Sequence, residues 1–302
     1  MSFIKEHYSP QSLEGLCRLF GKTRQAFYDT NWREEKQTME NEIVLQEVSR
    51  IKSSQPRIGG RKLHYMMSDF LNVHQIKMGG DQLFDLLSVH GLLVRKRKRR
   101  VSTTNSYHRF RKYPNLVRSL EIVRPEQLWV SDITYIATAH GFCYLSLITD
   151  AFSKLIVGYN LENTLATEGC IKALQMALQG RKYRKYSLIH HSDRGIQYCS
   201  NEYVQLLQEQ LINISMTEKG DPYENAIAER VNGILKDEFT LYNQFASYEQ
   251  AKLKIDQSIA IYNTERPHAS CNYLTPLQAH NEDIKLIKRW KNYSKNKTDD
   301  EQ

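Results

Sequence analysis

The stretch Tyr186–Tyr198, "YSLIHHSDRGIQY", begins as an apolar strand and then turns into a cluster of polar side chains. Its first half is rich in apolar and aromatic residues, a composition that favours a β-strand. Asp193 follows directly at the end of that strand, flanked by His191 and Arg194. A carboxylate delivered by a buried strand is costly unless it is paired or binds a cation. Asp193 is therefore a candidate functional residue, and we expect His191 and Arg194 to orient a carboxylate or to contact phosphate.

Four further runs read as strands and extend the pattern on both sides. They are "QLWVSDIT" (127–134), "CYLSLITD" (143–150), "LIVGYNL" (155–161) and "INISMT" (212–217). Helical patterns lie between the later strands and after the last one, at 163–180, 201–211, 225–239 and 247–262. Three strands followed by alternating helices and strands predict an α/β core over 120–285, with a mixed five-stranded sheet and flanking helices.

Two more carboxylates are expected to join Asp193. Asp132 lies within the first strand-like run, so we expect both aspartates to emerge at one edge of the sheet if their strands are neighbours. Glu229 follows the turn-rich loop 220–225 in the first turn of a helix that Asn225 is placed to cap. Two carboxylates a few ångströms apart repel each other unless a cation joins them. Three converging carboxylates form a hard-oxygen site suited to Mg²⁺ or Mn²⁺. Asp150, by contrast, reads as a turn residue.

The spacing of these residues resembles that of a known superfamily. Thirty-five residues separate Asp193 from Glu229, and with Asp132 this is similar to the signature of DDE transposases and retroviral integrases. The motifs "HSDRGIQY", "DPYENAIAERVNGILKDE" and "YNTERPHASCNYLTP" resemble the OrfB transposases of the IS-three family of insertion sequences, in the same order and over nearly the whole chain.

The resemblance implies a fold, a reaction and a cofactor. It implies an RNase H-like core in which Asp132, Asp193 and Glu229 are catalytic and hold two Mg²⁺ ions, for which Mn²⁺ can substitute, with Asp132 between the ions. It also implies DNA strand cleavage at element ends followed by strand transfer, the chemistry of DNA integration and recombination. In the carboxy-terminal motif, Arg266 is expected to close the core.

The expected DNA contacts lie near these carboxylates and in the amino-terminal part of the chain. Lys236, two helical turns after Glu229, is expected to contact a DNA end, and a solvent-facing lysine is the alternative. Tyr223 either stacks on a base or is an ordinary loop tyrosine. The remaining candidates are Arg24, Arg194 and the basic run Arg95, Lys96, Arg97, Lys98, Arg99 and Arg100. Such a run neutralises DNA phosphates, or else it is a solvated linker or targeting signal.

The front of the chain is helical and basic. Residues 1–113 hold 21 Lys and Arg against 11 Asp and Glu, whereas the remainder holds 21 against 23. Residues 1–54 are expected to contain a helix-turn-helix-like unit, with a short helix from Thr23 to Tyr28 after Gly21 and a separate helix at 34–52; a plain helical hairpin is the alternative. A second helical DNA-binding-like unit and a basic linker are expected over 55–115, and a polar tail over 286–302.

Composition excludes several other classes. The longest apolar runs are far shorter than a membrane span, and "MSFIKEHYSP" lacks the apolar stretch of a secretory signal, so we expect a bacterial cytoplasmic protein with no membrane partner, bound to the nucleoid when it acts. Five widely spaced cysteines without a C-x-x-C pair argue against a disulfide scaffold or a zinc knuckle.

Two other functions remain open at the level of the sequence. One is an RNase H-like metal nuclease that cuts DNA without joining it, and the other is a non-catalytic helix-turn-helix DNA-binding regulator. The expected partners are double-stranded DNA, as transposon ends and target, further copies of the chain assembled on that DNA, and an OrfA protein as separate partner or fusion.

Overall fold

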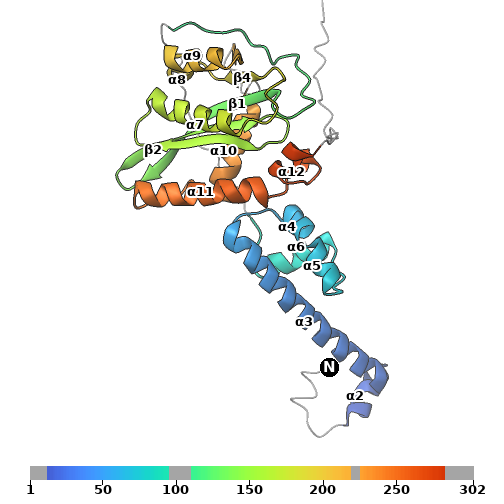
Figure 1. The fold of residues 1–302 in the computed structure, drawn as a ribbon. Helices are drawn as coiled ribbons and strands as arrows, with labels where there is room; N and C mark the ends of the chain where they lie inside the picture. Colours follow the sequence, from blue (N-terminus) through green and yellow to red (C-terminus); the bar gives the residue numbers. More distant parts are fainter. Residues whose placement is uncertain (1–11, 95–109, 219–224, 283–302) are drawn as a thin grey trace, which may run out of the picture. The chain divides into compact units, whose positions relative to one another are not determined.

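The computed structural model describes residues 12–94, 110–218 and 225–282, and these form two compact units (Figure 1). The first unit comprises Met1–Ser53 and Leu63–Leu93, and the second comprises Ser54–Lys62 and Val94–Gln302. The division differs from the domain boundaries expected from the sequence, which separated the helices before residue 54 from those after it. The expected tail, 286–302, lies outside the described residues.

The described part of the first unit is all-helical. Its helices are α2 (Leu13–Leu19), α3 (Arg24–Ser54), α4 (Gly60–Met66), α5 (Ser68–Val73) and α6 (Gly80–Val89). Gly21 makes the turn between α2 and α3 with a φ of 63°, and the Thr23 hydroxyl caps α3 by accepting the backbone N–H of Ala26 at 3.1 Å. The prediction of two separate helices after Gly21 is wrong, because α3 runs unbroken for 31 residues. No glycine or proline interrupts it, so the polar stretch at 29–33 that was read as a connection continues the helix.

The second unit contains the predicted mixed sheet. Its strands are β1 (Leu128–Thr138), β2 (Gly141–Asp150), β3 (Ile156–Glu162), β4 (Ile189–Ser192) and β5 (Asn213–Met216). They lie in the order β3-β2-β1-β4-β5, with β1, β2 and β3 antiparallel and with β4 parallel to both β1 and β5. This arrangement, with helices on both faces, confirms the expected RNase H-like core.

Helices cover both faces of the sheet (Figure 1). One face packs against α7 (Thr167–Gly180), α8 (Ile196–Cys199) and α9 (Asn201–Glu209), and the other against α10 (Ala226–Glu238) and α11 (Tyr248–Thr264). Side chains of β1 alternate between these layers: Trp129 is buried with α7 and α9, whereas Val130 is buried with Ala228 of α10. Asp132 falls on the same side of β1 as Val130, so the strand presents its carboxylate to α10.

A glycine allows α7 to approach the sheet closely. A Cβ added to Gly158 in β3 would lie 2.1 Å from the Ala173 carbonyl oxygen and 2.9 Å from the Ala177 Cβ. Only a residue without a side chain fits between β3 and this face of α7.

The carboxy-terminal motif closes the core, as predicted for Arg266. Asn263 binds both backbone groups of Ile156, donating to its carbonyl and accepting its N–H at 3.0 Å each. Arg266, which is 1% exposed, donates to both carboxylate oxygens of Glu238 at 2.7 and 2.9 Å. The motif is therefore structural in this chain.

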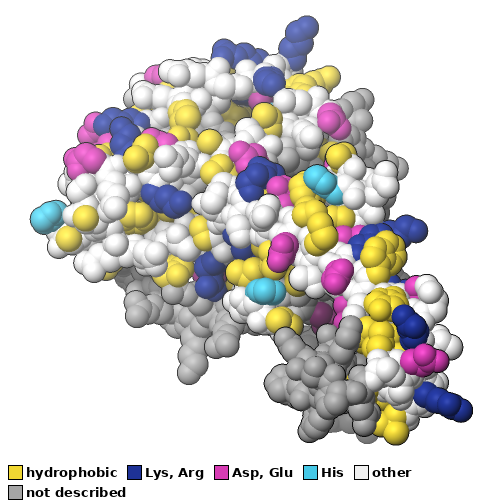
Figure 2. Space-filling view, turned by 90° about the horizontal axis from the view of Figure 1, so that it is seen from below, with side chains coloured by type: hydrophobic (Ala, Val, Ile, Leu, Met, Phe, Trp, Pro, Cys, Tyr) yellow, Lys and Arg dark blue, Asp and Glu magenta, His cyan; other side chains and the backbone are white. Residues whose placement is uncertain are grey.

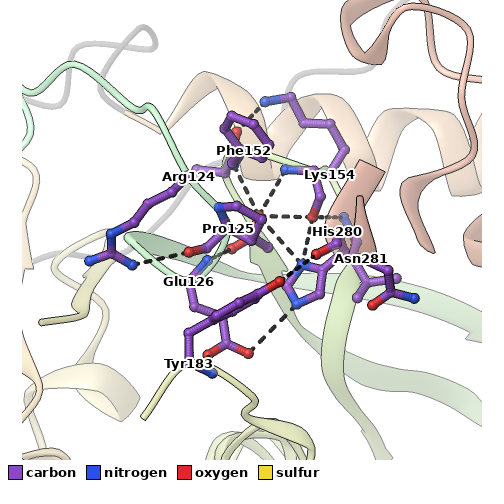
Figure 3. A network of polar contacts seen from close by, with 12 residues as sticks. Arg124, Pro125, Glu126, Phe152, Lys154, Tyr183, His280 and Asn281 are labelled. Carbon is purple, nitrogen blue, oxygen red and sulfur yellow. Dashed lines mark hydrogen bonds and ion pairs between the residues drawn. The ribbon is translucent and has the colours of Figure 1, made fainter. Parts of the chain in front are cut away.

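A buried polar network holds the last described helix, α12 (Pro276–Asn281), against the sheet (Figure 3). The imidazole of His280 lies 3.6 Å from Glu126 and 3.9 Å from Asp150, and Ser153 bridges to it at 3.0 Å. Asp150 also accepts the backbone N–H groups of Phe152 and Ser153, which confirms its reading as a turn residue. The network joins the strand ends to the carboxy-terminal helix.

All five cysteines are buried and free. Within 12–94, 110–218 and 225–282, no helix combines the length and the apolar character needed to cross a membrane.

Candidate active site

The site is centred on β1 and β4 at the point where their pairing stops. The parallel register joins Leu128 to Ile189 and Val130 to His191, and β4 ends at Ser192. Carried two residues further, the same register puts Asp132 opposite Asp193. Asp132 lies in the middle of β1 and not at a sheet edge as expected, because β1 and β2 continue as a long hairpin past the end of β4. The two aspartates nevertheless meet at the carboxyl end of β4.

Both aspartates are held by local hydrogen bonds. Asp193 accepts a hydrogen bond from the backbone N–H of Gly195 at 2.9 Å. This bond closes a turn that leads into α8. Asp132 accepts its neighbour's N–H, that of Ile133, at 2.9 Å through Oδ1, and the side-chain amide of Asn232 at 2.7 Å through Oδ2. Asn232 belongs to α10 and is 5% exposed. A helix 100 residues away in sequence therefore fixes the orientation of the Asp132 carboxylate.

Glu229 lies in the first turn of α10, as predicted, with its side chain exposed. Asn225 occupies the N-cap position of this helix, as predicted, although its side chain makes no capping bond. Its amide donates instead to the Ser131 carbonyl oxygen at 3.0 Å, because the helix start is tied to β1 next to Asp132. Asn225 and Asn232 thus attach α10 to two consecutive residues of one strand.

The charges of Asp193 and Glu229 both act on the Asp132 carboxylate. Burial and the neighbouring charges of Asp193 and Glu229 raise the pKa of Asp132 to about 7, against the lowering effect of its hydrogen bonds from Asn232 and Ile133. A centre with several carboxylate oxygens and a net negative charge is suited to bind a divalent cation. Among the described residues, no three His, Cys, Asp or Glu side chains surround a single point closely enough to hold one ion.

Lys236 also belongs to this region. It follows Glu229 by two helical turns and is half-buried; burial lowers the pKa of its ammonium group, while the charge of Asp132 opposes that shift. Arg194 is half-buried, and its positive charge acts on the Cys199 thiol of α8. Of the two, Lys236 is the one whose pKa is affected by the charge of Asp132.

The two histidines point to opposite faces of the sheet. His190 Nε2 lies 2.7 Å from the Ser131 hydroxyl and 2.9 Å from the Tyr203 hydroxyl, and burial lowers the pKa of its imidazole to about 3. His191 Nδ1 bonds to the Ser215 hydroxyl at 2.8 Å, and its ring is fully buried. The expectation that His191 contacts phosphate is therefore wrong, since its ring packs inside the protein.

The other candidates are not brought to the carboxylates in the described structure. Arg24 lies at the start of α3 in the first unit. Tyr223 and the run Arg95–Arg100 lie outside the described residues.

Sequence reasoning missed the two asparagines. Asn232 follows Glu229 by three residues and so lies on the same face of the helix. This spacing is the sequence feature from which a role for Asn232 near the site could have been predicted. The bond from Asn225 to Ser131 carries no such signal, because 94 residues separate the two.

Comparison with known proteins adds the family. Residues 123–222 match a family model described as an integrase core domain, and residues 210–276 match a second model with the same description. The chain is 32% identical over 268 residues to the "Insertion element IS600 uncharacterized 31 kDa protein" of Shigella sonnei, an alignment that covers 86% of this chain and 96% of that protein.

The chain is also similar to a named transposase and to a solved structure. The chain is 28% identical over 284 residues to "Transposase InsF for insertion sequence IS3fB" of Escherichia coli (strain K12), covering 93% of this chain and 98% of that protein. Among solved structures, the HTLV-2 integrase catalytic core domain in complex with magnesium superposes with a TM-score of 0.42 at 20% identity, covering 52% of this chain and 97% of that one. The integrase core domain and the nearly full-length similarity to insertion-sequence proteins show that the chain belongs to the IS3 (IS-three) family of DDE transposases.

Proposed function

We propose that Asp132, Asp193 and Glu229 are the catalytic residues of this transposase and that they hold two Mg²⁺ ions, with Asp132 contacting both. The observation that carries the proposal is the raised pKa of Asp132, on which the charges of Asp193 and Glu229 both act. Integrases and DDE transposases generally use divalent metals. Mn²⁺ is expected to replace Mg²⁺ because it prefers the same oxygen ligands.

The reaction proposed is cleavage of DNA strands at element ends and transfer of the freed ends to target DNA. Two bound ions would activate the attacking oxygen and stabilise the leaving 3′ oxygen in an in-line displacement. The protein's part is to fix the carboxylates. Asn232 orients Asp132, Asn225 ties the start of α10 to β1, and the Gly195 N–H orients Asp193.

DNA contacts are proposed for the cations nearest this centre. Lys236 is the first, since its ammonium group senses Asp132 from the helix that carries Glu229. Arg194 is the second, because it follows Asp193 directly. On the face seen in Figure 2, the Lys and Arg of the described residues are interspersed with Asp and Glu and form no continuous basic patch. The two DNA contacts are therefore proposed because Lys236 and Arg194 lie near the carboxylates and not because of a basic surface. Arg24, Tyr223 and the run Arg95–Arg100 are proposed as contacts on the sequence alone.

The assembly proposed is at least a dimer on DNA, because two element ends must be joined in one reaction. An OrfA protein, as a partner or a fusion, is proposed to supply further end recognition. Both proposals rest on the family resemblance.

Strand-transfer assays on oligonucleotides that carry element ends test the proposal. Asp132→Asn, Asp193→Asn and Glu229→Gln are each expected to abolish Mg²⁺-dependent cleavage and joining while DNA binding persists. Glu202→Gln is the matched control for Glu229→Gln, because both are exposed glutamates in the first turn of a helix.

Each outcome has a defined reading. Retained strand transfer in any of the three variants removes that residue from the catalytic set. Cutting without joining identifies a nuclease, and a mobility shift without cutting identifies a regulator. Loss of activity in Glu202→Gln would mean that Glu229→Gln acts through the helix and not through the site.

A further inference from the structure

The helix that carries Glu229 ends in a buried cluster of charges around Glu238. Glu238 is the last residue of α10, where the negative end of the helix dipole makes a carboxylate unfavourable. Two cations compensate for this position: Arg266 binds both carboxylate oxygens, and Lys62 donates to Oε1 at 2.6 Å. Burial alone would raise the pKa of Glu238, but Arg266 and Lys62 lower it to about 2. The carboxylate is therefore held charged by partners from two distant parts of the chain.

Lys62 belongs to a short segment that docks on the end of α10. The backbone N–H of Arg57 donates to the Glu238 carbonyl oxygen at 3.1 Å, which satisfies a carbonyl that the helix end leaves open. Gln55 and Ile58 of the same segment are each 1% exposed. The segment, Ser54–Lys62, belongs to the second unit although the residues on both sides of it belong to the first. In sequence, the segment connects two parts of the helical unit, but its own contacts are with the catalytic unit.

This attachment is the third of three that hold α10. Asn225 binds the Ser131 carbonyl at the start of the helix, Asn232 binds Asp132 in the middle, and Glu238 binds Lys62 and Arg266 at the end. Two of these anchors are on β1, and the third is shared between Lys62 and Arg266. A helix of 13 residues is about 20 Å long and stiff, so a shift at its last turn moves its first turn as well.

We propose that Lys62 is a positioning residue that couples the segment Ser54–Lys62 to α10 and so to the placement of Glu229. The role assigned to Glu229 rests on the proposed function, whereas the coupling between Lys62 and the first turn of α10 does not.

The test replaces Lys62 by Met, which removes the ion pair and keeps most of the side-chain volume. Glu238 retains Arg266, so the buried carboxylate stays compensated. Hydrogen exchange of the DNA-free protein is measured at the amides of the first turn of α10, and strand transfer is measured with its kcat and its KM for end DNA. We expect faster exchange in that turn and a fall of about tenfold in kcat, with KM unchanged, because a small misplacement of a catalytic group slows the chemical step.

Two control variants separate positioning from general stability. Lys62→Arg keeps the charge and is expected to restore both readouts. Lys172→Met removes a surface lysine that binds Glu162 and Glu168 at 2.8 and 2.9 Å, far in sequence from α10, and is expected to change neither. If Lys62→Met does not fold, Lys62→Gln, which keeps an amide donor, is measured in its place.

The outcomes distinguish this inference from the proposed function. Unchanged exchange in the first turn of α10 overturns the coupling, whatever the activity. An equal loss of activity in Lys172→Met also overturns it. Strand transfer that survives Glu229→Gln removes Glu229 from the site but leaves the exchange result as a test of the coupling.

Discussion

Asp132 lies on β1, and Asp193 directly follows the last residue of β4, the strand that pairs in parallel with β1, so the charge of Asp193 acts on the Asp132 carboxylate. The approach of two carboxylates is unfavourable without a cation, and the raised pKa of Asp132 reflects that repulsion together with burial. A divalent cation bound at the proposed site would relieve this repulsion.

The first prediction concerns that destabilisation. Asp132→Asn is expected to stabilise the metal-free protein by about 1 to 2 kcal/mol, because it removes the charge repulsion and the cost of burying a carboxylate, while the amide oxygen still accepts one hydrogen bond. Added Mg²⁺ or Mn²⁺ is expected to raise the Tm of the wild type and to raise that of the variant much less. Thermal unfolding with and without metal measures both. Equal metal-induced shifts in the two proteins would place the ions elsewhere.

The second prediction concerns Asn232. Replacing it by Leu removes the 2.7 Å bond to Asp132 while keeping the side-chain volume. We expect strand transfer to fall by about tenfold to a hundredfold, the usual effect of removing a residue that orients a metal ligand, with DNA binding unchanged. Asn160→Leu is the matched control, because Asn160 makes a similar bond to Glu162 at 3.1 Å in β3. Full activity of Asn232→Leu would show that Asp132 is oriented without it.

The third prediction is a pH dependence of stability that arises from His280 (Figure 3). Burial would lower the pKa of this imidazole, but Asp150 and Glu126 raise it from 6.5 to about 9. Because the folded pKa lies above the unfolded one, the charged histidine stabilises the fold fully below pH 6.5. That contribution is lost as the pH rises to 9, and it amounts to roughly 3 kcal/mol.

Urea unfolding at a series of pH values measures this contribution. The free energy of unfolding is expected to fall between pH 6.5 and 9 in the wild type and to be flatter in His280→Gln. His140→Gln, a change at an exposed position, is the control and should keep the wild-type slope. A wild-type slope in His280→Gln would assign the pH dependence to other groups.

The fourth prediction concerns the close approach of α7 to β3. Gly158→Ala is expected to destabilise the fold by about 3 kcal/mol or more, because its Cβ would lie 2.1 Å from a backbone oxygen that cannot move freely. Gly180→Ala, at the end of α7, meets no atom within 4 Å and is expected to be neutral or stabilising by up to about 1 kcal/mol. Denaturant titration of both variants checks the contrast, and equal stabilities would show that α7 can shift.

Much of the core was predictable from local patterns. Strand-like composition located all five strands, and the helical period located α7, α9, α10 and α11. Asp193 was found because it stands at the end of a strand, and Glu229 because it opens a helix after a loop. The continuous α3 was missed, because a polar stretch without glycine or proline reads equally well as a connection or as an exposed helix.

What the sequence by itself determined is the set of elements and the residues that stand at their ends, since both follow from side-chain period and backbone preference within a few residues. What only the tertiary structure decided is which of these residues touch. It placed Asp132 in the middle of a strand. It also joined residues 28 to 176 positions apart, through the bonds from Asn225 and Asn232 to β1 and the ion pairs of Glu238 with Lys62 and Arg266. Such contacts depend on strand order, register and helix packing, which minimise the free energy of the whole fold and leave no mark in any short stretch of sequence.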